Sequence, residues 1–145
     1  MHTYGELLKL GHFFIPGAEE MLAELAKNYR LFLVSNGTAS VQDSRLKSAG
    51  IAPMFEQIYI SERIGYEKPD CRFFDHCFSL IPGFSKDRAI ILGDSLSSDI
   101  QGGINAGIQT CLFDSRGDKH SEASCPNYCI RPLSEFPGLV AKLFN

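Results

Sequence analysis

Two aspartates, Asp94 and Asp99, stand five residues apart just after a short apolar run at residues 89–92. Such a run is typical of a buried strand, and the small polar residues that follow are typical of a helix start. Mg²⁺ takes one or two carboxylates and completes its shell with water and phosphate oxygens. The sequence therefore indicates phosphate chemistry, with Asp94 and Asp99 as candidate metal ligands.

Two further polar residues fit the same chemistry. Ser35 follows an apolar run at residues 31–34, and Lys68 stands before the start of an expected helix. A lysine offers a point charge to a phosphoryl group, and a hydroxyl offers a hydrogen bond. The backbone amides of Asn36 and Gly37 would add donors where the chain turns into the next helix. Ligands of open α/β sheets bind at the carboxyl ends of the strands, so these groups are expected to converge.

The elements that must position these residues alternate along the chain. Strands are expected at residues 31–34, 58–60, 89–92, 110–113 and 128–130. Helices are expected from residue 16, from 38 to 50, from 69 to 80, from 99 to 106, and at the end of the chain to 144. This order favours βαβ units and an open parallel α/β sheet with helices on both faces. Three phenylalanines of the third helix are expected in the core: Phe73, Phe74 and Phe78.

Composition limits the class of protein. The 145 residues are 44% hydrophobic, which is sufficient for a single core domain over residues 1–145. A net charge of −3 without any basic run argues against nucleic acid or an anionic membrane as partner. Five cysteines, an odd number without a CxxC pair, favour a reducing cytoplasm over a disulfide framework.

Three motifs in this order resemble a known family. The segments 34–37 (Val-Ser-Asn-Gly), 65–69 (Gly-Tyr-Glu-Lys-Pro) and 93–99 (Gly-Asp through Asp) are similar to the second, third and fourth motifs of the haloacid dehalogenase (HAD) superfamily. The resemblance covers about residues 15 to 135 and is nearest to bacterial pyrimidine 5′-nucleotidases. It implies a Rossmann-like core and an Mg²⁺-dependent phosphomonoester hydrolase acting on a small phosphorylated metabolite.

The resemblance also implies roles for particular residues. Lys68 would neutralise the phosphoryl group, and Asp94 would bind Mg²⁺ directly. Asp99 would hold a metal-bound water or the lysine. Substrate-binding roles are implied for Ser35, Asn36, Gly37 and Lys68, with Ser35 and Lys68 also catalytic.

The N-terminal region departs from the family pattern. The family attacks phosphorus with an aspartate on its first strand and uses a second aspartate two residues later as acid and base. Residues 1–15 contain no aspartate. We therefore expect residues 1–15 to be a remnant of the cap or linker, with the first central strand and the helical cap missing. The 145 residues alone are then expected to be inactive, with weak or absent Mg²⁺ binding, and the alternative is a non-catalytic binding or interaction module.

A missing central strand would leave two strand edges with unpaired backbone groups. Four ways to fill the gap are open: the segment 12–15, direct closure of the two strands, a strand swapped from a second copy, or a separate complementing N-terminal segment. Self-association is the expectation that exposed edges favour.

Each motif also has a plainer interpretation. Asp94 is suited to cap a helix, and Asp99 to its first turn. Lys68 alone would be a surface lysine, and residues 35–37 alone a turn. The order of motifs excludes a response-regulator receiver domain, in which the Lys-Pro pair follows the last strand. A zinc site at Cys125, Cys129 and His120 has poor ligand spacing.

Overall fold

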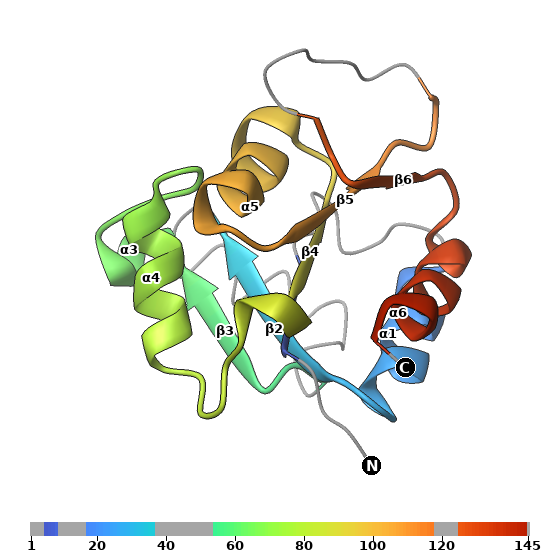
Figure 1. Cartoon of the computed structure of the whole chain (residues 1–145), viewed down its shortest axis with the longest axis horizontal. Coiled ribbons are helices and arrows are strands. Elements are labelled where there is room, and N and C mark those ends of the chain that lie inside the picture. The colour runs from blue at the N-terminus through green and yellow to red at the C-terminus, as the bar shows by residue number, and fades with distance from the viewer. Residues whose placement is uncertain (1–4, 9–16, 37–53, 118–124, 145) are drawn as a thin grey trace.

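Six parallel strands form one sheet in the part of the chain that this computed structural model describes, residues 5–8 (backbone only), 17–36, 54–117 and 125–144. The strand order is β3-β2-β1-β4-β5-β6 (Figure 1). The strands are β1 (Gly5–Leu8), β2 (Arg30–Ser35), β3 (Gln57–Ile60), β4 (Ile90–Gly93), β5 (Gln109–Phe113) and β6 (Tyr128–Ile130).

Helices cover both faces of this sheet. They are α1 (Ala18–Ala26), α3 (Ser61–Ile64), α4 (Cys71–Ser79), a π-helical turn (Leu96–Ile100), α5 (Gln101–Ala106) and α6 (Phe136–Phe144). Figure 1 shows α1 and α6 together on one side and α4 with α5 on the other. The predicted open parallel sheet with helices on both faces is confirmed. None of the helices in the described part of the chain is long and apolar enough to cross a bilayer.

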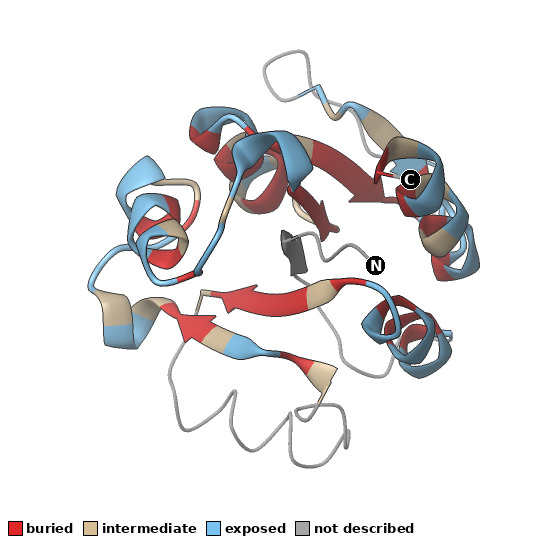
Figure 2. Cartoon of the chain, turned by 60° about the horizontal axis from the view of Figure 1, so that its bottom comes forward, coloured by how far each residue is buried: buried red, intermediate tan, exposed pale blue. Residues whose placement is uncertain are grey.

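The strands are buried on both sides, as their apolar runs predict. In β2, Leu31 and Leu33 pack with α1 and α6, whereas Phe32 and Val34 pack with α4. β2, β4 and β5 are almost wholly buried, and Figure 2 shows buried strands between helices whose outer surfaces are exposed. Each fully buried Leu or Phe contributes about 1.5–3 kcal/mol, so these two layers hold the sheet and fix the positions of its strand ends.

The centre of the sheet differs from the expectation. β1 occupies the place between β2 and β4 that was expected to be vacant, and Leu8 pairs in parallel with both Leu33 and Leu92. The physical reason is that unpaired backbone groups on two inner edges need partners. The chain supplies these partners from its own residues 5–8, which were expected to be a cap remnant. Because β1 fills the place between β2 and β4, the vacant edges that favoured self-association are not there. The candidate segment 12–15 lies outside the described residues.

One other expectation, the helix over 38–50, also falls on residues outside the described part of the chain. The remaining helices follow the sequence closely. Asp70 caps α4, since its carboxylate accepts a hydrogen bond of 2.9 Å from the Arg72 N–H. Phe73 and Phe74 are fully buried and Phe78 is half-buried, which confirms the apolar face of α4.

Helix α5 packs unusually close to its neighbours because it contains two adjacent glycines. A Cβ added at Gly102 would lie 2.6 Å from the Phe74 ring and 3.4 Å from Cα of Pro69. At Gly103 it would lie 2.5 Å from Thr110. The absence of side chains there lets α5 contact the segment that carries Lys68.

Candidate active site

The candidate site lies where the direction of strand order reverses. From β1 the chain proceeds outward through β2 and β3, and then returns to the other side of β1 for β4, β5 and β6. Ligands of doubly wound sheets bind at the carboxyl ends of the strands at such a point. Ser35 is the last residue of β2, and Asp94 follows Gly93, the last residue of β4. The predicted residues from two separate motifs are therefore brought to one edge.

A buried ion pair joins two of the predicted residues. Lys68 Nζ lies 2.5 Å from Asp99 Oδ1, and neither side chain is exposed to solvent (0% for both). The same ammonium donates a longer hydrogen bond, 3.4 Å, to the backbone oxygen of Val34 at the end of β2. The pair therefore places one positive charge between the ends of β2 and β4, where water does not screen it.

Asp99 is held in place by the turn after β4. Its Oδ2 accepts a hydrogen bond of 3.3 Å from the backbone N–H of Ser95. A Cβ added at Gly93 would lie 2.4 Å from that same oxygen. Ser95 also accepts a hydrogen bond from the Ser98 N–H and so caps the π-helical turn. Glycine at position 93 is thus what allows the carboxylate to lie against the end of β4.

The side chain of Asn36 performs a role that the sequence did not indicate. The expectation placed Asn36 among the substrate-binding residues, through its backbone amide. In the structure its Oδ1 accepts a hydrogen bond of 2.9 Å from the Lys68 N–H, and its Nδ2 donates one of 3.1 Å to the Lys68 carbonyl oxygen. A second asparagine, Asn105 of α5, donates to the carbonyl oxygen of Pro69 at 3.0 Å. Its position beside Ser35 indicated that Asn36 belongs to the site. Nothing in the sequence indicated that its side chain binds the main chain of Lys68, 32 residues away.

The other predicted residues are less tightly enclosed. Ser35 is buried, and its hydroxyl donates a hydrogen bond of 3.3 Å to the backbone oxygen of Asn36. Asp94 is half-buried at the same edge of the sheet. Gly37 lies outside the described residues. The site therefore has an enclosed part, formed by Lys68 and Asp99, and a less buried residue, Asp94.

The donor set at this edge suits a magnesium ion only in part. Both oxygens of Asp99 are already engaged, one by Lys68 and one by the Ser95 N–H. Among the described residues, His, Cys, Asp and Glu side chains nowhere gather in threes around a possible metal position. The residues fit an ion that takes Asp94 as its carboxylate and obtains its remaining ligands from water and phosphate oxygens.

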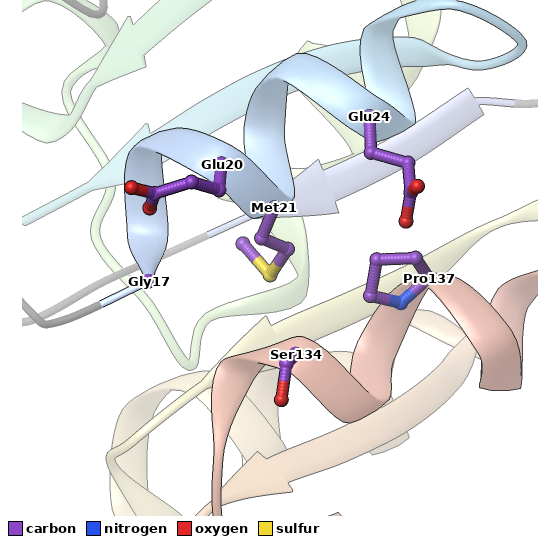
Figure 3. A pocket seen from close by; sticks show the side chains of 6 residues that line it. All are labelled: Gly17, Glu20, Met21, Glu24, Ser134 and Pro137. Carbon is purple, nitrogen blue, oxygen red and sulfur yellow. The ribbon is translucent and has the colours of Figure 1, made fainter.

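A hollow lies between α1 and α6 and has different chemistry from the sheet edge. A cavity of about 300 Å³ is lined by residues of both helices and of the turn before α6 (Figure 3). Glu20 and Glu24 are among them, and Figure 3 shows the Glu24 side chain directed toward Pro137. The lining side chains include two carboxylates and no cation, which is unfavourable for a phosphate. Of the two places, the sheet edge with its buried lysine is the better suited to an anion.

The two buried cysteines, Cys77 and Cys111, are poorly suited to act as an alternative nucleophile. Burial raises the pKa of Cys77 and of Cys111 to about 12, so both thiols stay protonated at neutral pH. Burial also raises the pKa of Cys129, although this residue is exposed overall. The zinc alternative gains no support, because Cys125 and Cys129 do not belong to a three-ligand group within the described residues and His120 lies outside them.

Known proteins similar to this chain agree on the family. A family model described as haloacid dehalogenase-like hydrolase matches residues 2–113. The pyrimidine 5′-nucleotidase PynA of Streptococcus pneumoniae is 39% identical over 116 residues, which are 79% of this chain and 48% of that protein. The pyrimidine 5′-nucleotidase YjjG of Escherichia coli is 31% identical over 128 residues, which are 88% of this chain and 57% of that protein.

A solved structure shows the same arrangement of elements. The crystal structure of the HAD-hydrolase YfnB from Bacillus subtilis, bound to magnesium, superposes with a TM-score of 0.85 at 36% identity. The match covers 87% of this chain and 55% of that one. The chain thus spans about half the length of the curated relatives it matches.

The doubly wound parallel sheet with its switch point defines the class of Rossmann-like α/β proteins. Within that class, the chain belongs to the family of haloacid dehalogenase-like hydrolases.

Proposed function

We propose that this chain forms the phosphate-binding part of a phosphomonoester hydrolase. One observation carries the proposal: the buried Lys68–Asp99 pair lies beside Ser35 at the carboxyl edge of the sheet. A fixed cation in a water-poor place stabilises the negative charge of a transferring phosphoryl group far more than a solvated lysine does. The family relationship and the nucleotidase relatives support the same conclusion.

Each residue of the site has a distinct part in the proposed reaction. Lys68 supplies the positive charge, and Asp99 keeps its ammonium oriented. The Ser35 hydroxyl turns from the Asn36 carbonyl oxygen to a phosphoryl oxygen when substrate binds. In the family's reaction an aspartate carboxylate attacks phosphorus, the P–O ester bond breaks, and the leaving alkoxide takes a proton from a second aspartate. Water then cleaves the phospho-aspartate and releases inorganic phosphate.

Two relatives support a proposal for the substrate class. PynA and YjjG are pyrimidine 5′-nucleotidases, so we assign small pyrimidine nucleoside monophosphates to this chain. Its five cysteines, without a CxxC pair, favour the reducing cytoplasm as its location.

Magnesium has a defined but limited place in this proposal. Asp94 would hold the ion, which neutralises phosphate charge when it is bound. Because Asp99 is engaged by Lys68, we expect Mg²⁺ affinity at the weak, ~mM end of carboxylate sites. Isothermal titration calorimetry of the wild type and of Asp94→Asn measures this affinity. Tight stoichiometric uptake by the wild type would contradict the expectation.

One observation favours a second candidate, a phosphate-binding module without hydrolysis. The strand between β2 and β4 is formed by residues 5–8, and their sequence, Gly-Glu-Leu-Leu, contains no aspartate. An enzyme of this family needs an aspartate at the carboxyl end of that strand. Residues 5–8 therefore complete the sheet without supplying the nucleophile.

The experiment that tests the proposal has two arms. The first measures binding of inorganic phosphate to the 145-residue chain, to Lys68→Met and to the exposed control Lys86→Met. We expect binding to the wild type and to the control, and a loss of at least tenfold in Lys68→Met, about the contribution of one charge-assisted hydrogen bond. Equal binding by all three would overturn the phosphate site.

The second arm separates hydrolase from module. Release of phosphate from uridine monophosphate is measured for the chain alone and for the chain in which residues 5–8 are replaced by an added strand that ends in Asp-x-Asp. The chain alone should be slower by about 10⁴ to 10⁶, by analogy with loss of a nucleophile elsewhere. Restoration by the added strand, and its loss again in Asp94→Asn, supports the hydrolase. Phosphate binding without restoration supports the module.

A further inference from the structure

The main chain around Lys68 is held by two asparagines from different elements. The side chain of Asn36, next to the end of β2, accepts a hydrogen bond of 2.9 Å from the Lys68 N–H and donates one of 3.1 Å to the Lys68 carbonyl oxygen. Asn105 of α5 binds the carbonyl oxygen of the next residue, Pro69, at 3.0 Å. Gln101 in turn donates to Asn105 Oδ1 at 2.8 Å, which orients the Asn105 amide.

These contacts matter because a lysine side chain is long and flexible. Four rotatable bonds separate its ammonium from the main chain, and fixing them costs about 1.5–2 kcal/mol of conformational entropy. Lys68 Nζ nevertheless has to lie both 2.5 Å from Asp99 and 3.4 Å from the Val34 oxygen. Hydrogen bonds from Asn36 beside β2 and from Asn105 of α5 fix the position of the main chain from which the Lys68 side chain extends. Productive geometry in such sites tolerates errors of only about 0.5 Å.

We propose that Asn36 and Asn105 are positioning residues for Lys68, and that Asn36 acts on phosphate through the lysine and not as a ligand of its own. This inference rests on the proposed function, in which Lys68 binds the phosphoryl group. The geometry favours it because the Asn36 oxygen and nitrogen already face the two peptide groups of Lys68. A side-chain amide so engaged has one N–H left to offer a substrate.

A double-mutant cycle distinguishes a positioning residue from a ligand. Inorganic phosphate binding is measured for the wild type, for Asn36→Ala, for a neutral background (Lys68→Met with Asp99→Asn), and for the neutral background with Asn36→Ala. A positioning residue should weaken binding by about tenfold in the wild type, which corresponds to about one hydrogen bond. It should have no further effect once the ammonium is absent. An equal loss in both backgrounds would identify Asn36 as a direct ligand and overturn the inference.

Two variants keep the test decisive if Asn36→Ala folds poorly. Asn36→Asp retains the oxygen that accepts from the Lys68 N–H, so it should recover part of the affinity. Asn105→Ala removes an exposed side chain from α5 and should fold; we expect a loss of about two- to threefold, again confined to the background with Lys68. Asn28→Ala, exposed at the far end of α1, is the matched control and should not change binding.

A second readout does not depend on phosphate binding. Reductive methylation with formaldehyde modifies lysine amines, and mass spectrometry of the Lys68 peptide, with exposed Lys86 as internal reference, gives its rate. The buried ammonium should react slowly in the wild type and several-fold faster in Asn36→Ala and Asn105→Ala. An unchanged rate in both variants would overturn the inference. If the wild type binds no phosphate, the proposed function fails, whereas the methylation rates still decide whether the asparagines hold Lys68.

Discussion

Two ion pairs of similar length lie in very different surroundings. The Lys68–Asp99 pair, 2.5 Å long, is fully enclosed between β2 and β4. The Arg30–Glu56 pair, 2.8 Å long, lies near the opposite ends of the strands, with 19% of the arginine and 48% of the glutamate side chain exposed. Arg30 also donates to the backbone oxygen of Pro82 at 2.7 Å. The exposed pair connects the start of β2 to the segment before β3, where water competes with every contact.

The comparison shows that distance is a poor guide to what an ion pair contributes. An exposed pair gains little, because water screens the charges and both side chains lose freedom. A buried pair has given up its water, so either partner becomes a large liability if the other is removed. In the proposed site, the burial of Lys68 with Asp99 beside the ends of two strands would keep the ammonium in place for an anion. The exposed pair does nothing of this kind.

Removing one partner of the buried pair should give the largest effect. Lys68→Met leaves the Asp99 carboxylate buried without its counter-charge, and we expect the free energy of unfolding to fall by about 3–5 kcal/mol. Adding Asp99→Asn removes that charge as well, so the double variant should be more stable than Lys68→Met alone. Urea unfolding followed by circular dichroism measures both. A double variant less stable than Lys68→Met alone would show that the two side chains do not depend on each other.

The close approach of Gly93 to Asp99 predicts the next largest effect. In Gly93→Ala the new Cβ would lie 2.4 Å from Asp99 Oδ2 and 2.5 Å from its Cβ, so the carboxylate has to shift. Overpacking of this kind costs about 1–3 kcal/mol, and phosphate binding should weaken with it. Gly138→Ala in α6 is the matched control, since its Cβ meets nothing within 4 Å. It should raise stability by up to about 1 kcal/mol through helix propensity. Equal thermal shifts in the two variants would refute this packing argument.

The exposed pair should be far less sensitive. Glu56→Gln keeps the side-chain length and removes the charge, while Arg30 retains its hydrogen bond to the Pro82 oxygen. We expect a loss below about 1 kcal/mol that shrinks further in high salt, because exposed charges are screened. Chemical unfolding at low and high salt provides the measurement. A loss as large as that of Lys68→Met would remove the distinction between the two pairs.

Much of the site could be predicted because its residues stand at strand ends. Ser35 and Asp94 each follow an apolar run, and parallel strands bring their carboxyl ends to one edge. The partner of Asp99 could not be decided from the sequence, because the family resemblance implied either a metal-bound water or Lys68. The structure shows the lysine.

The parts that could not be predicted depend on contacts between distant residues. Asn36 and Lys68 are 32 positions apart, and nothing local in the sequence indicates their two hydrogen bonds. Residues 5–8 are too short a run to be distinguished from a linker by periodicity, and they become a strand because the flanking edges of β2 and β4 supply the partners. Tertiary pairing, not local propensity, decided both features.

The smallest effect is expected at the cap of α4, where Asp70 and Arg72 form another exposed pair at 2.7 Å. Hydrogen bonds from the Arg72 side chain, and then from its backbone N–H, hold the pKa of Asp70 below its ordinary value. A carboxyl with a lowered pKa in the folded state stabilises the fold fully above its unfolded pKa, near 4, and loses that contribution as pH falls through the folded pKa. Asp70→Asn keeps the capping oxygen and removes the charge, so it should be slightly less stable than the wild type at pH 7. The two proteins should converge when thermal unfolding is repeated at successively lower pH below 4. A difference that persists unchanged to the lowest pH would mean that shape, and not charge, sets the contribution of this cap.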